Sequence, residues 1–271
     1  MNYFKNICVN DHIYQIKDPM GVLMTLIIGS EKAMLIDTGY GIENIYQHIR
    51  TLTSLPLIVV NSHGHMDHCC GNYLFENVYI HEKDLELCVL HNCLEWRKRN
   101  LQTAKNMKLI DDLYNDNYYL EQRHGNLTNL SYHQMFDLGN ISIEVINMEG
   151  HTKGSVGFYI HEDKLLVTSD AACPFVWLFL EESTTLDTYI KMLEKTIDIP
   201  FDGILVGHGP GIILPRQKMF DFLNCGKNLT LEESVKVSFN NFDHLNSYCY
   251  TKGKMYDQND VGIVFNPSKI K

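Results

Sequence analysis

The sequence predicts an α/β protein in which strands pack together as a sandwich and helices cover the outer faces. Short β-rich runs bounded by turn residues occur in both halves of the chain, and segments with helical periodicity separate them. The 271 residues are 45% hydrophobic and 21% charged, which is ordinary for a folded globular protein. No linker rich in proline, glycine or serine divides the chain, so residues 1–271 are expected to form a single domain.

The first half begins as a meander of strands followed by one helix. Turn residues at 29–31 and 37–39 end the β-rich runs. A helical period then precedes a continuous apolar run that is typical of a buried strand. The expected strands are 13–16, 23–28, 33–36 and 57–60, and the expected helix is 42–52.

A helical pattern follows in the middle of the chain. Between Glu82 and about Arg123, apolar residues recur at spacings of three, four or their sums, at Leu87, Leu90, Leu94, Met107, Ile110, Leu113 and Tyr114. We interpret residues 82–125 as a helical insertion that serves as a lid or as the surface of a homodimer. Its mixed charges, as in Glu95 to Arg99, also fit a solvated helix face.

The second half repeats the architecture of the first. A helix is expected at 186–197, and another near Pro215, because proline suits the first turn of a helix. Residues 241–271 form a C-terminal extension that ends in a hairpin-like pair of strands, 248–251 and 261–265. The remaining expected strands are 141–146, 155–160, 164–168 and 203–206.

Charge and cysteine usage exclude several classes of protein. With 23 Lys and Arg against 33 Asp and Glu, the formal net charge is −10, which argues against a nucleic-acid surface. The longest apolar stretches, 21–29 and 171–180, are shorter than the roughly 20 residues of a membrane helix. The eight cysteines form no CxxC motif, and the N-terminus lacks a signal peptide, so reduced thiols and a cytoplasmic location are expected.

One segment carries the strongest chemical signal. The expected strand 57–60 leads into His63-Gly64-His65-Met66-Asp67-His68, which places four potential metal ligands within six residues. Imidazole and carboxylate together suit zinc, with iron or manganese as weaker candidates. Four ligands in one tight loop do not easily face one ion, so the economical arrangement sends His63 and His65 to one metal and the other two to a second.

Further ligands follow strands of the second half. They are His151 in Gly-His-Thr, Asp170 in Ser-Asp and His208 in Gly-His-Gly. His151 is a candidate to complete the first site and His208 to complete the second. One carboxylate, that of Asp170, is a candidate to bridge both metals.

The motifs HGHMDH, GHTKGS, TSDAA and GHG, with IDTG upstream, resemble those of the metallo-β-lactamase superfamily of binuclear metallohydrolases over about residues 20–215. The resemblance implies a four-layer αβ/βα sandwich with the metal site at one edge between its halves. It assigns His63, His65 and His151 to one metal, Asp67, His68 and His208 to the other, and Asp170 to both. It places Asp37 behind the ligands, where its carboxylate orients an imidazole; the alternative is that Asp37 only ends a strand.

The resemblance also implies hydrolysis of a small-molecule substrate by a hydroxide that bridges two zinc ions, with Asp67 accepting or relaying a proton. A carboxylate at Asp170, where true β-lactamases usually carry Cys or Ser, is similar to the glyoxalase II, lactonase and phosphodiesterase branches. His65 stands where the diiron branch carries Glu, which favours zinc. A carboxylic ester, thioester or lactone is the expected substrate. A small-molecule phosphodiesterase and a non-catalytic sensor are the alternatives.

The apolar run 174–180 either lines the substrate pocket or belongs to the core.

Overall fold

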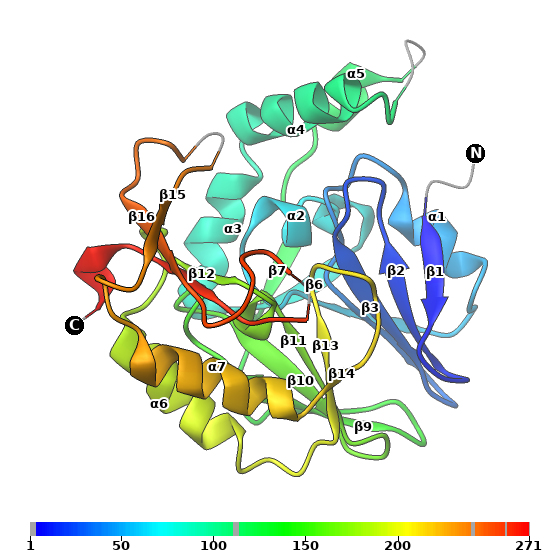
Figure 1. Cartoon of the computed structure of the whole chain (residues 1–271). Helices are drawn as coiled ribbons and strands as arrows, with labels where there is room; N and C mark the ends of the chain where they lie inside the picture. Colours follow the sequence, from blue (N-terminus) through cyan, green and yellow to red (C-terminus); the bar gives the residue numbers. More distant parts are fainter. Residues whose placement is uncertain (1–3, 111–113, 240–241, 258, 271) are drawn as a thin grey trace. The chain divides into compact units, whose positions relative to one another are not determined.

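A computed structural model describes residues 4–110, 114–239, 242–257 and 259–270 of the chain. The chain divides into two compact units, Met1–Ser142 and Ile143–Lys271 (Figure 1). No helix in the described part combines the length and apolar composition that a membrane crossing requires.

The first unit is built on a seven-stranded sheet whose spatial order follows the sequence from β1 to β7. Strands β1 to β4 pair antiparallel, and β4 to β7 pair parallel. Its core is a set of fully buried apolar side chains that includes Ile16, Met24, Leu26 and Leu35. The strands are β1 (Lys5–Cys8), β2 (Ile13–Lys17), β3 (Leu23–Ile28), β4 (Ala33–Ile36), β5 (Leu57–Val60), β6 (Asn77–His81) and β7 (Asn126–Leu130), and β8 (Met135–Asp137) ends the unit.

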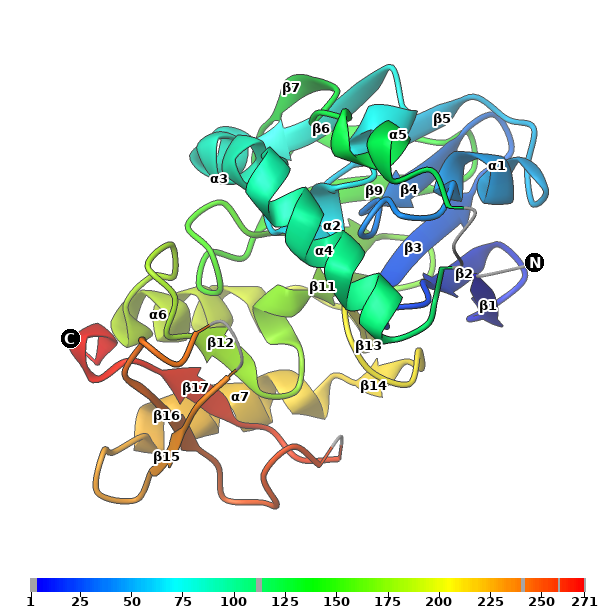
Figure 2. The ribbon, with the colours of Figure 1, turned by 90° about the horizontal axis from the view of Figure 1, so that it is seen from above.

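Three helices lie in the segment after Glu82 where a helical pattern was expected, and they contain Leu87, Leu90 and Leu94, whereas Met107, Ile110 and Tyr114 lie outside them and Leu113 lies outside the described residues. The longest of them, α4, has 13 residues (Figure 2). Its buried Arg97 lies between the rings of Tyr73 and Tyr119, and its Nη2 donates a hydrogen bond to the carbonyl of Cys70 at the end of α2. The helical elements are α1 (Ile45–Arg50), α2 (Met66–Cys69), η1 (Asn72–Leu74), η2 (Glu82–Asp84), α3 (Leu85–His91), α4 (Leu94–Asn106) and α5 (Asp116–Leu120).

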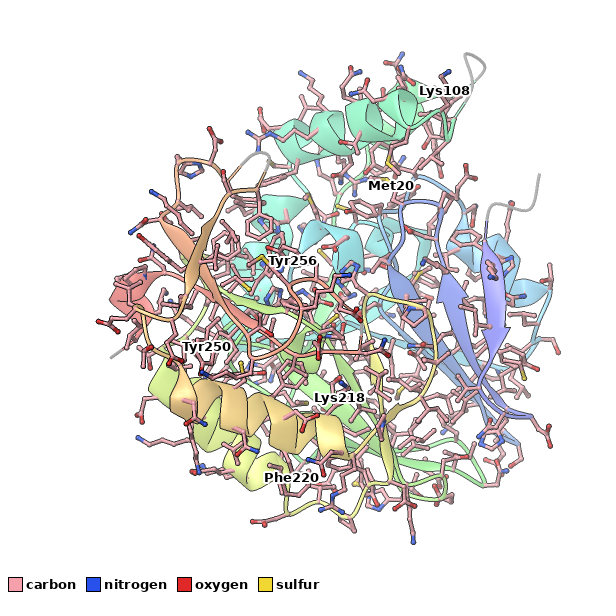
Figure 3. The ribbon with its side chains drawn as sticks, viewed as in Figure 1. Met20, Lys108, Lys218, Phe220, Tyr250 and Tyr256 are labelled. Atoms are coloured by element: carbon pink, nitrogen blue, oxygen red, sulfur yellow. The ribbon has the colours of Figure 1, made fainter. Side chains whose placement is uncertain are left out.

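The second unit has two sheets and two long helices. Five strands of this unit belong to its larger, six-stranded sheet, in the order β14-β13-β11-β10-β9, and the smaller sheet has the order β12-β17-β16-β15. Helices α6 (Leu186–Thr196) and α7 (Gln217–Asn228) pack together, and α7 carries Lys218 and Phe220 (Figure 3). The strands are β9 (Ser142–Asn147), β10 (Val156–Ile160), β11 (Leu165–Ser169), β12 (Val176–Leu178), β13 (Gly203–Val206), β14 (Leu214–Pro215), β15 (Val235–Val237), β16 (Ser247–Tyr250) and β17 (Ile263–Phe265), with 3-10 turns η3 (Asp170–Ala172) and η4 (Pro267–Lys269).

Two differences from the sequence expectations have local causes. Helix α1 is shorter than the expected 42–52, because the side chain of Asn44 caps its start by accepting from the N–H of Gln47, and Gly41 has a φ of 70°. Seven strands were not expected, namely β1, β6, β7, β8, β12, β14 and β15. Polar and exposed residues dominate β1 and β7, so neither shows a clear apolar pattern.

Candidate metal centre

The loop between β5 and α2 is held tightly by the residues that follow it in the first unit. The N–H of Gly64 donates to Oδ2 of the buried Asp84 at 2.9 Å. A Cβ at position 64 would lie 2.8 Å from the carbonyl oxygen of Asp84 and 2.9 Å from the amide nitrogen of Cys88. Glycine is therefore required for this close approach, which brings the flanking histidines together.

His63 and His65 form the first pair of candidate ligands. Nε2 of His63 lies 3.1 Å from Nδ1 of His65, and both side chains are buried. The other ring nitrogen of His63, Nδ1, lies 2.9 Å from the hydroxyl of Ser62. Two imidazole nitrogens thus converge on one point, while a hydroxyl contacts the far side of one ring.

Asp67 and His68 form the second pair, and Asp37 lies behind it. Nε2 of His68 lies 3.5 Å from Oδ2 of Asp67, while Nδ1 lies 2.8 Å from Oδ2 of Asp37. Asp37 also accepts from the N–H of Ser62 at 2.7 Å and from its hydroxyl at 2.8 Å. Because a carboxylate only accepts, Nδ1 of His68 carries the proton and Nε2 keeps its lone pair beside Asp67. Asp37 holds this position with a φ of 68°, in the left-handed region.

In the second unit, main-chain groups orient His151. Nδ1 of His151 donates to the carbonyl of Trp177 at 2.9 Å, so Nε2 carries the lone pair. That nitrogen lies 3.8 Å from Oδ2 of Asp170. The hydroxyl of Ser183 donates to the carbonyl of His151 at 2.8 Å, which fixes the loop that carries the ring.

Asp170 lies between two imidazoles of the second unit. Its Oδ2 is 3.8 Å from Nε2 of His151 and 3.4 Å from Nε2 of His208. The preceding residue, Ser169, has φ 45° and ψ −125°, a conformation that L-residues rarely adopt. Backbone strain at the end of β11 therefore accompanies the placement of this carboxylate.

The donor sets of both units fit a transition metal. Imidazole nitrogens and carboxylate oxygens are the donors that zinc binds in proteins. Within each unit, the ligand atoms of the predicted residues lie within 4.8 Å of one another, for the pairs His63 and His65, Asp67 and His68, and Asp170 and His208. The chemistry of these donors matches the expected cofactor.

Several residues that support these ligands were not expected from the sequence. Ser62 precedes the motif directly, so its position was a usable signal. Trp177 contributes only its carbonyl and Ser183 only a hydroxyl. Neither leaves a side-chain pattern typical of a metal site.

The thiol of Cys69, directly after the motif, is buried. Cys69 is fully buried and donates from Sγ to the carbonyl of Gly64 at 3.4 Å. Burial, with a smaller effect of the neighbouring Cys70 and Cys88, raises the pKa of the Cys69 thiol well above its ordinary value. Cys69 packs in the core of the first unit with Ile80 and Cys88.

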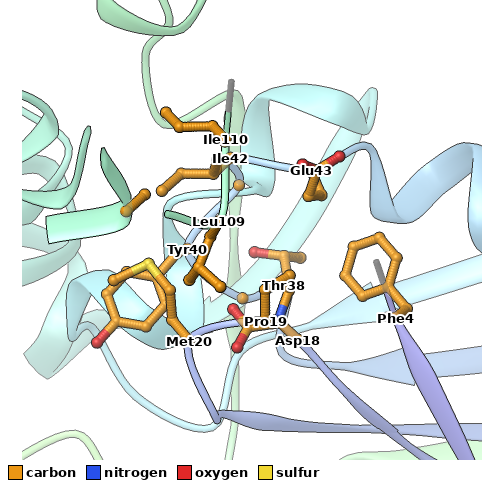
Figure 4. Close-up of a pocket in the computed structure, with 13 residues that line it drawn as sticks. Phe4, Asp18, Pro19, Met20, Thr38, Tyr40, Ile42, Glu43, Leu109 and Ile110 are labelled. Carbon is orange, nitrogen blue, oxygen red and sulfur yellow. The ribbon is translucent and has the colours of Figure 1, made fainter. Parts of the chain in front are cut away.

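A pocket of about 330 Å³, including its open mouth, lies in the first unit and is lined in part by residues 38–43, which directly follow Asp37 (Figure 4). At its base, Oδ1 of the buried Asp18 accepts from the N–H groups of Gly21 and Val22 at 2.7 and 3.0 Å. Burial raises the pKa of Asp18 to about 6, although these hydrogen bonds lower it. The pocket is lined mainly by apolar side chains, among them Phe4, Pro19, Met20, Tyr40, Ile42, Leu109 and Ile110.

Comparison with known proteins gives one family and a set of distant relatives. The family model described as the metallo-beta-lactamase superfamily matches residues 18–208. The acyl-coenzyme A thioesterase MBLAC2 of Homo sapiens is 22% identical over 201 residues, which cover 69% of this chain and 71% of the relative. The protein of the same name from Gallus gallus is 20% identical over 214 residues, covering 69% and 70%.

Solved structures show the same fold. A metallo-beta-lactamase from Pontibacter korlensis has a TM-score of 0.59 at 15% identity and covers 83% of this chain and 100% of its own. The stereoselective inverting sec-alkylsulfatase Pisa1 from Pseudomonas sp. has a TM-score of 0.62 at 15% identity, covering 83% and 42%. The archaeal superfamily protein ST1585 from Sulfolobus tokodaii has a TM-score of 0.55 at 16% identity, covering 89% and 91%. These similarities confirm the predicted α/β fold class.

Proposed function

Because the chain belongs to the metallo-β-lactamase superfamily and is a hydrolase, we propose that it cleaves carboxylic thioesters, at a centre of two zinc ions. Esters and lactones are members of the same carbonyl class and are the next candidates. The observation that carries the proposal is the carboxylate of Asp170, whose Oδ2 lies within 3.4 and 3.8 Å of two imidazole nitrogens. The curated relatives, named acyl-coenzyme A thioesterases, favour a thioester within that class.

In this proposal the ligands of the two units act together. His63, His65 and His151 would hold one ion, Asp67, His68 and His208 would hold the other, and Asp170 would contribute to both. Two hydrogen bonds support this proposal, because Asp37 accepts one from Nδ1 of His68 and the carbonyl of Trp177 accepts one from Nδ1 of His151. Nε2 of each ring therefore keeps the lone pair that a metal binds. Iron or manganese is the alternative occupant, and metal analysis of the purified protein distinguishes them.

When bound, the metals supply a nucleophilic water of lowered pKa and polarise the carbonyl of the substrate. The side chains of the chain provide the proton transfer. Oδ2 of Asp67 is 3.5 Å from His68, and 17% of the Asp67 side chain is exposed, so water and substrate reach it. Asp67 accepts a proton as the C–O bond forms and returns it to the leaving sulfur as the C–S bond breaks. One thioester and one water thus give one carboxylic acid and one thiol.

The test is a panel of acyl thioesters, esters, lactones and small phosphodiesters, assayed with zinc-loaded and manganese-loaded protein. We expect turnover of thioesters and a loss of at least about 100-fold in kcat/KM for Asp170→Ala. Asp187→Ala is the matched control, because Asp187 is exposed on α6 and forms an ion pair with Lys191. Turnover restricted to phosphodiesters would reject the thioester assignment. Zinc binding without any hydrolysis would favour a sensor.

A further inference from the structure

Four aromatic rings gather on one face of the smaller sheet of the second unit. The ring of Trp177 lies 4.6 Å from that of Phe239, 5.1 Å from that of Phe179 and 6.0 Å from that of Phe242, measured between centroids. The rings of Phe179 and Phe239 are stacked at 5.3 Å with an interplanar angle of 15°. We call these four residues the aromatic wall.

The wall faces away from the helices of its unit. Along β12, Val176 and Leu178 belong to the core cluster that contains Leu193 of α6 and Phe222 of α7, whereas Trp177 between them packs in a different cluster. Successive side chains of a strand point to opposite faces, so the two clusters lie on opposite sides of the sheet.

Three rings of the wall are only half-buried, which distinguishes it from the core on the helical side. Trp177, Phe239 and Phe242 keep part of their surface in solvent, while Leu193 and Phe222 are fully buried. At the rim, the ring of Tyr256 is 49% exposed and lies 6.3 Å from that of Phe239 (Figure 3). Aromatic carbon that stays open in this way is available to an apolar ligand.

The wall is joined directly to a candidate metal ligand. The carbonyl of Trp177 accepts a hydrogen bond from Nδ1 of His151, and the side chain of the same residue belongs to the aromatic wall. Two residues earlier, Phe175 has a φ of 61°, which is an outlier for a bulky residue. A loop that is strained at this position fixes the direction of the strand that carries Trp177.

We propose that the aromatic wall binds the apolar acyl group of the substrate and so determines acyl-chain preference; this rests on the proposed function. The carbonyl of the substrate reacts beside His151 and Asp170. The acyl chain attached to this carbonyl therefore extends within reach of Trp177, which orients His151. Aromatic faces bind alkyl and aryl carbon, and the acyl chain is the apolar group that is attached directly to the reacting carbonyl. The wall therefore takes the acyl side of the substrate and not the thiol side.

The two tryptophans of the chain, Trp96 and Trp177, allow binding to be measured without turnover. In Trp96→Phe, Trp177 is the single fluorescent tryptophan. Fatty acids brominated along the chain are the probes, because bromine quenches a tryptophan that it contacts. We expect saturable quenching by brominated acids and not by their unbrominated counterparts, with a half-saturation concentration that falls about fourfold per added methylene. Trp177→Phe, which retains Trp96, should show no such quenching.

Chain-length profiles of thioester hydrolysis give the second readout. Phe239→Ala and Phe242→Ala should lower kcat/KM for octanoyl or decanoyl thioesters about tenfold or more and leave acetyl thioesters nearly unchanged. Phe220→Ala is the matched control, because Phe220 is a half-buried phenylalanine on α7 (Figure 3). Its profile should equal that of the wild type.

The outcomes separate the two proposals. Quenching of Trp177 without any thioester turnover would support the wall as an acyl-binding surface and reject the thioesterase assignment. Turnover with no quenching and with identical profiles for all three variants would overturn the wall and leave the thioesterase assignment intact.

Discussion

The carboxylate of Asp37 lies 2.8 Å from Nδ1 of His68, at the point where β4 ends and α2 begins. The same carboxylate accepts both the N–H and the hydroxyl of Ser62, whose oxygen in turn lies 2.9 Å from Nδ1 of His63. One buried acid therefore contacts two of the proposed metal ligands, His68 directly and His63 through the hydroxyl of Ser62.

This relationship predicts that Asp37→Asn weakens metal binding while every ligand is retained. An asparagine replaces one acceptor oxygen with a donor, so either Ser62 or His68 loses its partner. We expect zinc affinity to fall about 10- to 100-fold, measured by competition with a chromogenic chelator. Asp187→Asn on α6, which is exposed, is the control and should bind zinc as the wild type does. Unchanged affinity in Asp37→Asn would show that Asp37 only shapes the turn.

Gly64→Ala is predicted to destabilise the first unit. The added Cβ would lie 2.8 Å from the carbonyl of Asp84 and 2.9 Å from the amide of Cys88, and both contacts are with main chain that cannot move aside easily. We expect a loss of about 1–3 kcal/mol in the free energy of unfolding, measured in urea.

Gly226→Ala in α7 supplies the comparison for this prediction. A Cβ there meets the side chain of Ile190 at 3.1 Å, and alanine favours a helix over glycine. Its free energy of unfolding should change by less than about 1 kcal/mol. Equal losses in the two variants would contradict the close approach at Gly64.

Much of the fold was predictable because its strands are apolar and its turns are marked. The expected ranges 23–28, 33–36 and 57–60 coincide with β3, β4 and β5, in which buried side chains are consecutive or nearly so. Strand β1 was missed because Lys5–Cys8 is largely exposed and shows no alternation. Short polar strands are defined by the neighbours with which they pair, and a single sequence does not show those neighbours.

In the candidate site, too, some features could be predicted from the sequence and others could not. His63 to His68 attracted attention because four donor side chains within six residues are improbable without a metal. The contact between His151 and the carbonyl of Trp177 spans 26 residues and involves no donor side chain of Trp177. Main-chain acceptors of this kind depend on tertiary structure, so residue types alone do not reveal them.

Asp18→Asn is predicted to change the pH dependence of stability. Burial raises the pKa of Asp18 from 3.8 to about 6, with a smaller contribution from the charge of Asp67, and Glu43 lines the same pocket. Between pH 3.8 and about pH 6 the folded state binds more protons than the unfolded state, because Asp18 is still protonated only in the folded state. The free energy of unfolding therefore falls as the pH rises through this range. The free energy of unfolding of the wild type, relative to the variant, should fall by about 2 kcal/mol from pH 4 to pH 6 and stay level above pH 7.

Urea unfolding of both proteins at pH 4.5 and pH 7.5 measures this difference, and groups common to both proteins cancel. In the variant, the asparagine oxygen still accepts from Gly21 and Val22, so the loop is expected to keep its conformation. A difference between wild type and variant that does not change with pH would contradict the raised pKa.

Arg97→Lys is predicted to destabilise the first unit although it preserves the charge. The guanidinium of Arg97 lies 5.3 Å from the ring of Tyr73 and 4.9 Å from that of Tyr119, and its Nη2 donates to Cys70, Asn92 and Arg123. A lysine offers no planar group to lie between two rings and leaves some of these buried acceptors without a donor. We expect a loss of about 2–3 kcal/mol in the free energy of unfolding, seen as a lower midpoint in urea.

Arg99→Lys is the control for this substitution, since Arg99 is exposed and lies over the ring of Trp96. It should change the midpoint very little, because an exposed cation–π contact contributes only about 0.5–1 kcal/mol and lysine retains part of it. Helix α4 is tied to the end of α2 through Nη2 of Arg97 and the carbonyl of Cys70. For that reason hydrogen exchange at the amides of α2 should accelerate in Arg97→Lys and not in Arg99→Lys. Equal exchange in both variants would show that α2 keeps its stability without this contact.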